Sequence, residues 1–312
     1  MNDLFGKVIL PHTARDILGR AFKGSNEEVS IDIRKDRVGV CGKTMTLYFE
    51  GGAEEMTILG VPARILWKLA GLEGEMDGTT MRFRDKKFAL DVETTQWLDE
   101  IPERPNSDKW RRIGDISHIR GLMSRTESCW WDIAGNISTH STYATAATFR
   151  DIGHLREESY RAMNLLSDPL ERILNAGVSE RFSMDDKRLW LEGYGAYASI
   201  GKADIVSMGA TPLVSLCEGY KKKAGIRMKA GGPTSGPVFF MSTRGIGIVR
   251  GAEGEWEFIV ERGARDFEVS VDDIHGLGSL WKGSVAIFLP EQSNYPAGFR
   301  DGRNWYWTMA TP

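Results

Sequence analysis

The 312-residue sequence predicts an α+β fold in which one unit recurs along the chain. Each unit is a short strand, a helix, and then two or more strands. Three observations predict this. Expected helix starts fall about 50 residues apart, which indicates an internal repeat. Short apolar runs typical of strands fill the intervals between helices. The hydrophobic content of 41% and the charged content of 27% are those of a globular chain.

The first two units are the clearest. In the second helix Pro62 suits the first helical position, and Ile65, Leu66 and Leu69 are spaced to share a buried stripe. The first unit comprises a strand at 7–10, a helix at 12–24 and strands at 28–34, 37–42 and 45–51. The second comprises a strand at 55–60, a helix at 61–73 and strands at 79–84 and 87–93.

The remaining units follow residues 101–110, which contain two prolines and polar residues and are typical of a linker. Pro169 is expected to interrupt the fourth helix. Helices are expected at 115–125, 156–168 with a continuation at 169–177, 213–225 and 271–283. Strands are expected at 129–139, 142–150, 180–186, 188–195, 196–204, 226–232, 237–243, 245–251, 255–261, 266–271, 284–291 and 304–310.

Composition narrows the class of protein. The sequence has neither a signal-peptide pattern nor an apolar run long enough for a membrane span, so we expect a cytoplasmic protein. Its three cysteines, Cys41, Cys129 and Cys217, include no CxxC pair, which argues against a disulfide framework or a zinc site. The formal net charge of −3 argues against a nucleic-acid partner unless basic and acidic groups are segregated on the surface.

Motifs for catalysis are scarce. The chain has no phosphate-binding P-loop and no HExxH, and its five histidines show no metal-ligand spacing. The glycines at 245–251 are flanked by strand-like sequence with no helix after them, which favours a turn over a dinucleotide site. The pairs Asp185–Asp186 and Asp272–Asp273 suit a turn and a helix start. We therefore expect neither an enzyme nor a cofactor.

Basic residues recur on the expected helices. Arg64 stands in a first helical turn, where the helix dipole disfavours a cation unless an anion lies outside. On any one helix the simpler explanation is a solvated surface, but repetition over six helices favours a shared basic surface. Arg15 is one of these basic residues. Those predicted to contact DNA are Arg20, Lys23, Arg64, Lys68, Arg120, Arg125, Arg156, Arg161, Lys221, Lys222, Lys223 and Lys282.

Trp130 and Trp131 are adjacent in an expected strand, so one should point inward and the other outward. Two interpretations remain open for the outward ring. It packs against another domain or subunit, or it stacks on a base or ribose. Trp67, in the second helix, is interpreted as a packing residue.

Residues 58–94, together with their PAR helix start and the following linker, resemble a segment of the bacterial β-type DNA sliding clamps. Residues 266–291 and the end of the chain resemble the last helix and C-terminal strand of the same family. This resemblance implies three domains of two units each, with helices lining a ring and sheets outside. The domains would be 1–110, 111–209 and 210–312, and two chains would close head to tail. Such short domains suggest a divergent member, for example from a phage.

The resemblance also implies a function and its residues. The protein would encircle duplex DNA and tether a replicative polymerase, with Lys23, Arg64, Arg156 and the loop through Arg125, Trp130 and Trp131 contacting DNA. The polymerase and a clamp loader would bind a pocket through short peptides. The residues corresponding to that pocket are Thr139, Ser141, Thr142, Tyr143, Met309, Ala310, Thr311 and Pro312.

Two other classes of protein compete with this interpretation. A repeat-built structural ring, such as a phage tail or capsid-associated protein, would share the strands and tryptophans without a need for basic residues on every helix. A β-rich hydrolase would need a catalytic constellation, which the sequence lacks.

Overall fold

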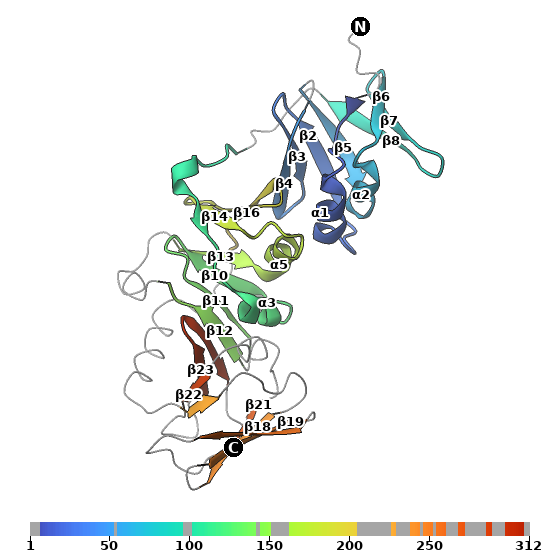
Figure 1. The fold of residues 1–312 in the computed structure, drawn as a ribbon. Helices are drawn as coiled ribbons and strands as arrows, with labels where there is room; N and C mark the ends of the chain where they lie inside the picture. Colours follow the sequence, from blue (N-terminus) through green and yellow to red (C-terminus); the bar gives the residue numbers. More distant parts are fainter. Residues whose placement is uncertain are drawn as a thin grey trace. The chain divides into compact units, whose positions relative to one another are not determined.

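The structure is a computed structural model of the chain, coloured along the sequence in Figure 1. The residues it describes are 7–52, 55–95, 102–141, 144–150, 162–204, 226–228, 238–243, 246–251, 254–259, 268–271, 285–288 and 297–308. The chain forms two compact units, Met1–Ile113 with Pro169–Lys202, and Gly114–Asp168 with Ala203–Pro312. Each unit combines one antiparallel sheet with short helices, which confirms the α+β class.

The first unit contains a 12-stranded sheet in which every neighbouring pair is antiparallel. In spatial order the strands are β1 Lys7–Val8, β6 Glu73–Asp77, β7 Thr80–Arg84, β8 Ala89–Thr95, β5 Met56–Pro62, β2 Glu28–Ile33, β3 Arg37–Cys41, β4 Met45–Glu50, β16 Ala196–Gly201, β15 Arg188–Gly193, β14 Arg181–Met184 and β9 Arg111–Arg112.

The helices beside this sheet are short. Helix α1 (Ala14–Ala21) buries residues 14, 17, 18 and 21, which is the spacing of one helix face. A 3₁₀ turn, η1 (Ala63–Ile65), leads into α2 (Leu66–Leu69), and η2 (Ser107–Lys109) lies in the expected linker. In the ranges that the structure describes, no helix is long and apolar enough to cross a membrane.

The second unit contains another 12-stranded antiparallel sheet, with α3 (Ser117–Met123) packed on β11 and β12. In spatial order its strands are β13 Ala162–Leu166, β10 Ser128–Asp132, β11 Ile137–His140, β12 Ala144–Thr148, β24 Asn304–Thr308, β23 Ala297–Asp301, β22 Val285–Phe288, β17 Ile226–Met228, β20 Gly254–Ile259, β19 Ile246–Gly251, β18 Val238–Thr243 and β21 Glu268–Val271.

Two strand pairings join segments that are distant in the sequence. β4 pairs with β16 in the first sheet, and β12 pairs with β24 in the second. The segment predicted as the middle domain, 111–209, therefore contributes strands to both sheets. The two compact units follow the sheets rather than the sequence order, and the three domain boundaries stay a prediction.

The prediction of the fourth helix is wrong at 162–166, which form a strand, whereas its predicted continuation at 169–177 is confirmed by a helix. A helix is expected at 156–168 with a break at Pro169, but Ala162–Leu166 form β13 and the helix α5 spans Ser167–Asn175. Proline fits the first helical turn because no intrahelical partner exists there for its missing N–H. Pro169 thus lies at the beginning of the helix rather than interrupting it. Helix starts at 14, 63, 117 and 167 keep a spacing of about 50 residues.

Besides β13, three of the described strands are not predicted by the sequence: β6, β9 and β23. β6 lacks an apolar alternation because its buried position is Gly74, where a Cβ would lie 2.6 Å from the Sδ of Met81. β23 pairs with β24 through a turn at Gly302, whose φ is 58°. The glycine-containing segment at 245–251 forms strand β19. The helix expected at 213–225 lies outside the described residues, as does that at 271–283 apart from Val271, which ends β21.

Candidate nucleic-acid interface

Helices α1 and α2 of the first unit pack against each other and turn a basic surface outward. Their apolar residues, including Leu18 and Leu66, are buried, so the remaining positions face away from the core. Those positions are largely cationic. Four of the cations are exposed and Lys68 is half-buried. We call this set the helical basic face: Arg15, Arg20, Lys23, Arg64 and Lys68.

Trp67 lies at the centre of the helical basic face. Its indole N–H donates to the carbonyl oxygen of Arg64 at 3.1 Å, and its own carbonyl oxygen accepts from Nε of Arg15 at 3.3 Å. The Lys68 Nζ is 5.6 Å from the ring centroid and the Arg15 Cζ is 6.0 Å from it, both at cation–π range. The side chain nevertheless remains 40% exposed. The interpretation of Trp67 as a packing residue alone is therefore incomplete.

The cations of the helical basic face have no carboxylate partner. Among the described residues, none of the five lies within ion-pair distance of an aspartate or glutamate. Asp16 is four residues before Arg20 on α1, yet these two side chains form no ion pair. The face is therefore a local excess of positive charge, despite the net charge of −3 of the whole chain.

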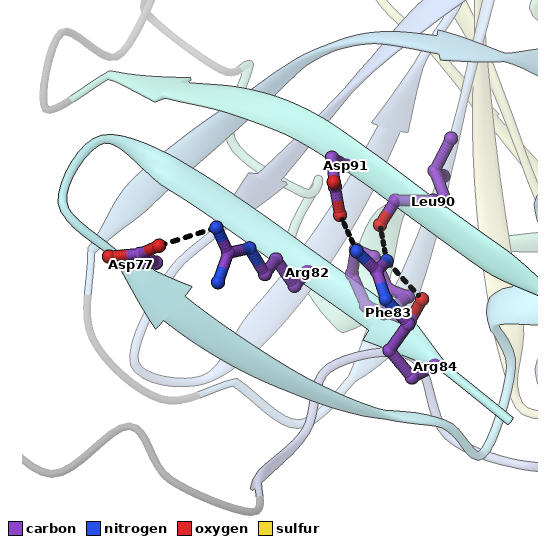
Figure 2. Close-up of polar contacts among 6 residues, drawn as sticks. All are labelled: Asp77, Arg82, Phe83, Arg84, Leu90 and Asp91. Atoms are coloured by element: carbon purple, nitrogen blue, oxygen red, sulfur yellow. Dashed lines mark hydrogen bonds and ion pairs between the residues drawn. The ribbon is translucent and has the colours of Figure 1, made fainter.

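Strands β6, β7 and β8 of the same unit show the opposite arrangement (Figure 2). Arg82 pairs with Asp77 at 2.5 Å, and Arg84 pairs with Asp91. Arg84 also donates to the carbonyl oxygens of Phe83 and Leu90, both at 3.0 Å. We call Asp77, Arg82, Arg84 and Asp91 the paired sheet face. Its arginines are about half exposed, but each is already bound to a carboxylate.

The second unit contributes two of the predicted cations. Arg120 lies half-buried on α3 and Arg125 is exposed just after it. The backbone N–H of Arg125 donates to the Leu122 carbonyl oxygen at 3.0 Å, so the chain continues the helical turn to this residue. Both arginines therefore come from the helix layer of their unit, as predicted.

The predicted alternation at Trp130 and Trp131 is wrong. Trp131 is fully buried and Trp130 is only 7% exposed. The whole run from Cys129 to Asp132 in β10 is buried, which means that both faces of the sheet are covered there. Alternation exposes every second side chain only where one face of a sheet meets water. Neither ring is presented to a base in this structure, so their assignment as DNA contacts is not supported.

The predicted peptide pocket is described only in part. Thr139 is 2% exposed and joins a network of hydroxyls, with its Oγ1 2.7 Å from that of Thr126 and donating to the Ser128 carbonyl oxygen. Its side chain is therefore internal and does not line a pocket. Ser141 is half-buried, and its hydroxyl accepts from the Ala144 N–H at 3.1 Å, which closes the turn before β12.

Several predicted residues lie outside the described ranges, and nothing in the structure tests them. Those predicted to bind DNA are Arg156, Arg161, Lys221, Lys222, Lys223 and Lys282. Those predicted to line the pocket are Thr142, Tyr143, Met309, Ala310, Thr311 and Pro312.

Buried ionisable groups in the described residues have structural roles. Asp32 accepts from the Thr57 hydroxyl at 3.1 Å and from Nε of Arg34 at 3.3 Å, while burial raises its pKa. Burial raises the pKa of Cys129 to about 12 and lowers the pKa of His118 to about 4. His118 Nε2 lies 2.9 Å from the Ala147 carbonyl oxygen. Within the described ranges, no three histidine, cysteine or acidic side chains gather as a metal site.

Trp67 belongs to this surface, although the sequence pattern favours a packing role for it, and Arg15 belongs to it as one of the recurring basic residues without being predicted as a DNA contact. Their signal is present in the sequence. Trp67 is three residues after Arg64 and next to Lys68, so a helical arrangement brings all three to one side. An aromatic residue among cations is easily interpreted as packing, because tryptophans are usually buried.

Solved bacterial DNA sliding clamps share this fold. The DNA polymerase sliding clamp from Pseudomonas aeruginosa matches with a TM-score of 0.61 and 13% identity, over 96% of this chain and 97% of that one. A putative DNA polymerase III β subunit from Eubacterium rectale matches with a TM-score of 0.61 and 10% identity, over 96% of each chain. The Helicobacter pylori β clamp bound to a DNA ligase peptide matches with a TM-score of 0.57 and 12% identity, over 97% of this chain and 99% of that one.

The sequence itself has diverged far from known proteins. No protein-family model matches it, and no curated protein matches it. The structural likeness nonetheless covers nearly the full length of both chains, which accounts for the repeated strand, helix and strands unit. The chain has the fold of the bacterial DNA sliding clamps.

Proposed function

We propose that this protein is a divergent β-type DNA sliding clamp, a ring that encircles duplex DNA and tethers a replicative DNA polymerase. The observation that carries the proposal is the helical basic face, whose five cations have no ion-pair partner in the described residues, on a chain with the clamp fold. The protein would act without catalysis, as a processivity factor in the cytoplasm.

Charge placement supplies the mechanism. Unpaired arginines and lysines bind phosphate oxygens and release counterions, so binding is independent of sequence and strongly dependent on salt. Contacts to phosphate fix the protein on DNA without reading bases, and each contact is interchangeable with the next one along the helix. The duplex can therefore move past the helical basic face without breaking any base-specific bond.

Two sheet edges support closure of the ring by a second copy. Apart from its last two residues, which pair with β5, the outer edge of β8 has no strand beside it within the described ranges. β20 is similar, with β17 beside it only at Ile259. An open edge is a template for another strand, and pairing β8 of one copy with β20 of the next gives a closed head-to-tail dimer.

The strand pairings that cross the sequence support the three proposed domains. β4 with β16 would join domain 1–110 to domain 111–209, and β12 with β24 would join the latter to 210–312. In this arrangement domain 111–209 would join one neighbouring domain through β16 and the other through β12.

Partner proteins would bind as short peptides. The Helicobacter pylori relative is a clamp bound to a DNA ligase peptide, and a Pseudomonas aeruginosa relative is a clamp bound to griselimycin. By analogy, this chain would bind its polymerase and clamp loader near Ser141, Thr142 and Tyr143 and the residues 309–312. Thr139 does not belong to this proposed pocket, because its side chain is internal.

The test is topological. Protein is incubated with nicked circular plasmid, with its loader if loading requires one, and bound complexes are isolated by gel filtration before and after linearisation. A clamp stays on the circle and slides off the linear molecule, whereas a side-on binder is retained equally on both. Equal retention would contradict the proposal. Sedimentation at several concentrations checks the dimer, and a monomer under all DNA-free and DNA-bound conditions would contradict ring closure.

A further inference from the structure

Trp67 is the one tryptophan that is exposed among the side chains that the structure describes. In the same ranges, the other large apolar side chains that are at least as exposed are Val8, Leu59 and Tyr194. Trp131, Trp190 and Trp307 are fully buried. An indole that is 40% exposed, in the middle of a surface of cations, forgoes favourable burial energy that its counterparts in the core retain. Tryptophan is enriched at binding interfaces, so an exposed indole surrounded by cations favours a contact with something outside the chain.

The ring is held in place rather than loose. Its N–H is bonded to the Arg64 carbonyl oxygen, so its polar edge is satisfied within the chain. Its Cβ abuts α1 at Gly19, where a methyl group would lie 3.7 Å away. Arg15 and Lys68 restrain it further from their cation–π positions. A fixed aromatic side chain loses little conformational entropy when a ligand stacks on it.

The surroundings of the ring specify the chemistry of the ligand. Arg15, Arg64 and Lys68 have no ion-pair partner among the described residues, which favours a polyanion. A ring beside phosphate-binding cations is the combination that binds single-stranded nucleic acid, with bases stacked on the aromatic side chain and phosphates on the cations. Bases inside a duplex are stacked on each other and offer no face to an indole.

We infer that Trp67, with Arg15, Arg64 and Lys68, is a binding site for unpaired nucleotides of a DNA strand. This inference rests on the proposed function and extends it. The protein would distinguish a junction between duplex and single strand from plain duplex, because only the junction supplies an unpaired base beside phosphates already held by the helical basic face. Trp67 would contact the base, and the three cations would contact the flanking phosphates.

The experiment compares two probes, a blunt duplex and the same duplex with a single-stranded oligothymidine tail. The quantity measured is the ratio of the two affinities at one salt concentration. Trp67→Leu keeps an apolar side chain against Gly19 but removes the aromatic face, and we expect it to lower the tailed-to-blunt ratio roughly tenfold. Trp67→Phe keeps a smaller aromatic face and should retain most of the ratio.

Tyr194→Asn is the matched control. Tyr194 is 77% exposed, no cation lies over its ring in the described residues, and its φ of 53° is one that asparagine tolerates. This variant should leave the ratio unchanged. Circular dichroism and thermal unfolding of all variants verify that they fold. Trp67→Met, which also lacks an aromatic face, replaces Trp67→Leu if that variant does not fold.

Two results would overturn the inference. If the ratio and both affinities of Trp67→Leu are unchanged, Trp67 does not contact DNA. If the ratio is unchanged while both affinities fall equally, Trp67 only holds the cations in position. Failure of the proposed function is separate, because the wild-type protein would then be retained equally on nicked and linear plasmid whatever the ratio. Retention of the control Tyr194→Asn on nicked circles should match that of the wild type.

Discussion

The helical basic face and the paired sheet face present the same side chains in different states. Arg20 and Arg64 have no carboxylate within ion-pair distance in the described residues, whereas Arg82 and Arg84 are bound to Asp77 and Asp91. Both faces belong to one compact unit. A paired guanidinium must release its carboxylate before it binds phosphate, whereas an unpaired one releases only water. Under the proposed function, the placement of carboxylates, more than that of arginines, would therefore determine where DNA binds.

This difference explains how a chain of net charge −3 can be proposed to bind DNA. Net charge sums over the surface, but DNA within a Debye length of about 8 Å responds to local charge. On the paired sheet face, ion pairs with carboxylates make the arginines less available to DNA phosphates. On the helical basic face the cations have no such pairs in the described residues and stay available. Overall composition is a weak guide here, because under the proposed function only the helical basic face would contribute to DNA binding.

The largest expected effect separates the two faces directly. One variant replaces with glutamine three cations of the helical basic face, Arg20, Arg64 and Lys68. Its control replaces with glutamine three ion-paired arginines of the same unit, Arg82, Arg84 and Arg181. Both change the net charge equally. The first should lower duplex affinity roughly a hundredfold near 0.15 M salt, and it should reduce the log–log salt slope by about 0.9 for each phosphate that the variant no longer neutralises.

The control should leave both affinity and slope nearly unchanged, and fluorescence anisotropy over a range of salt concentrations measures both. An equal loss in the two variants would mean that total charge, rather than the helical basic face, drives binding. In that case the two faces would contribute equally to DNA affinity, and the assignment of the clamp fold would be unaffected.

A buried histidine, His118, differs from the arginines of both faces because its side chain carries no charge in the folded protein at neutral pH. Burial of His118 on α3 lowers its pKa from 6.5 to about 4, so the folded protein keeps it neutral over that range. Between pH 6.5 and 4 the unfolded chain binds a proton that the folded chain does not, and the free energy of unfolding falls as pH falls. The decrease from this residue should reach roughly 2 kcal/mol at pH 5.

His118→Gln removes the titration and keeps an N–H to donate to the Ala147 carbonyl oxygen. Urea unfolding of both proteins between pH 7 and pH 4 is the measurement. The difference in free energy of unfolding between variant and wild type should change in favour of the variant as pH falls. A difference that stays constant over this range would show that His118 is not the group responsible.

Local patterns predict the helices of the first unit well. Proline and apolar spacing near Pro62 place the second helical segment, and η1 begins one residue later. The fourth helix is wrongly predicted over 162–166 because Pro169 is interpreted as a breaker within a helix, although proline is compatible with the first turn of the helix that follows. Strand β6 is missed because Gly74 occupies its buried position, and its packing against Met81 and Ile9 is a tertiary contact that leaves no periodic signal.

The residues of the candidate site divide in the same way. Charge on a helix can be predicted from the sequence, and the outward cations of α1 and α2 are where the pattern places them. Burial depends on what covers each face of a sheet, and for that reason Trp131 is expected to alternate with its neighbour and does not. Exposure of Trp67 has the same origin, since only the packing of α1 against α2 determines how much of its ring is covered.

The smallest expected effect comes from making the arginines of the paired sheet face resemble those of the helical basic face. Asp77→Asn with Asp91→Asn removes both carboxylates of the paired sheet face and leaves Arg82 and Arg84 in place. Each exposed ion pair contributes only about 0.2–1 kcal/mol, so the protein should stay folded with a slightly lower melting temperature. Its duplex affinity should rise a few-fold, because two guanidinium groups become available to phosphate.

The position of the gained binding is as informative as its size. If the gain resides on the sheet side, combining the two substitutions with glutamine at Arg20, Arg64 and Lys68 should leave weak binding to linear duplex that does not require a closed circle. Anisotropy with linear duplex and retention on nicked plasmid measure the two contributions. If freeing Arg82 and Arg84 produced no gain at all, pairing with carboxylates would not explain why the two faces differ, and local geometry of the helix layer would have to provide the explanation.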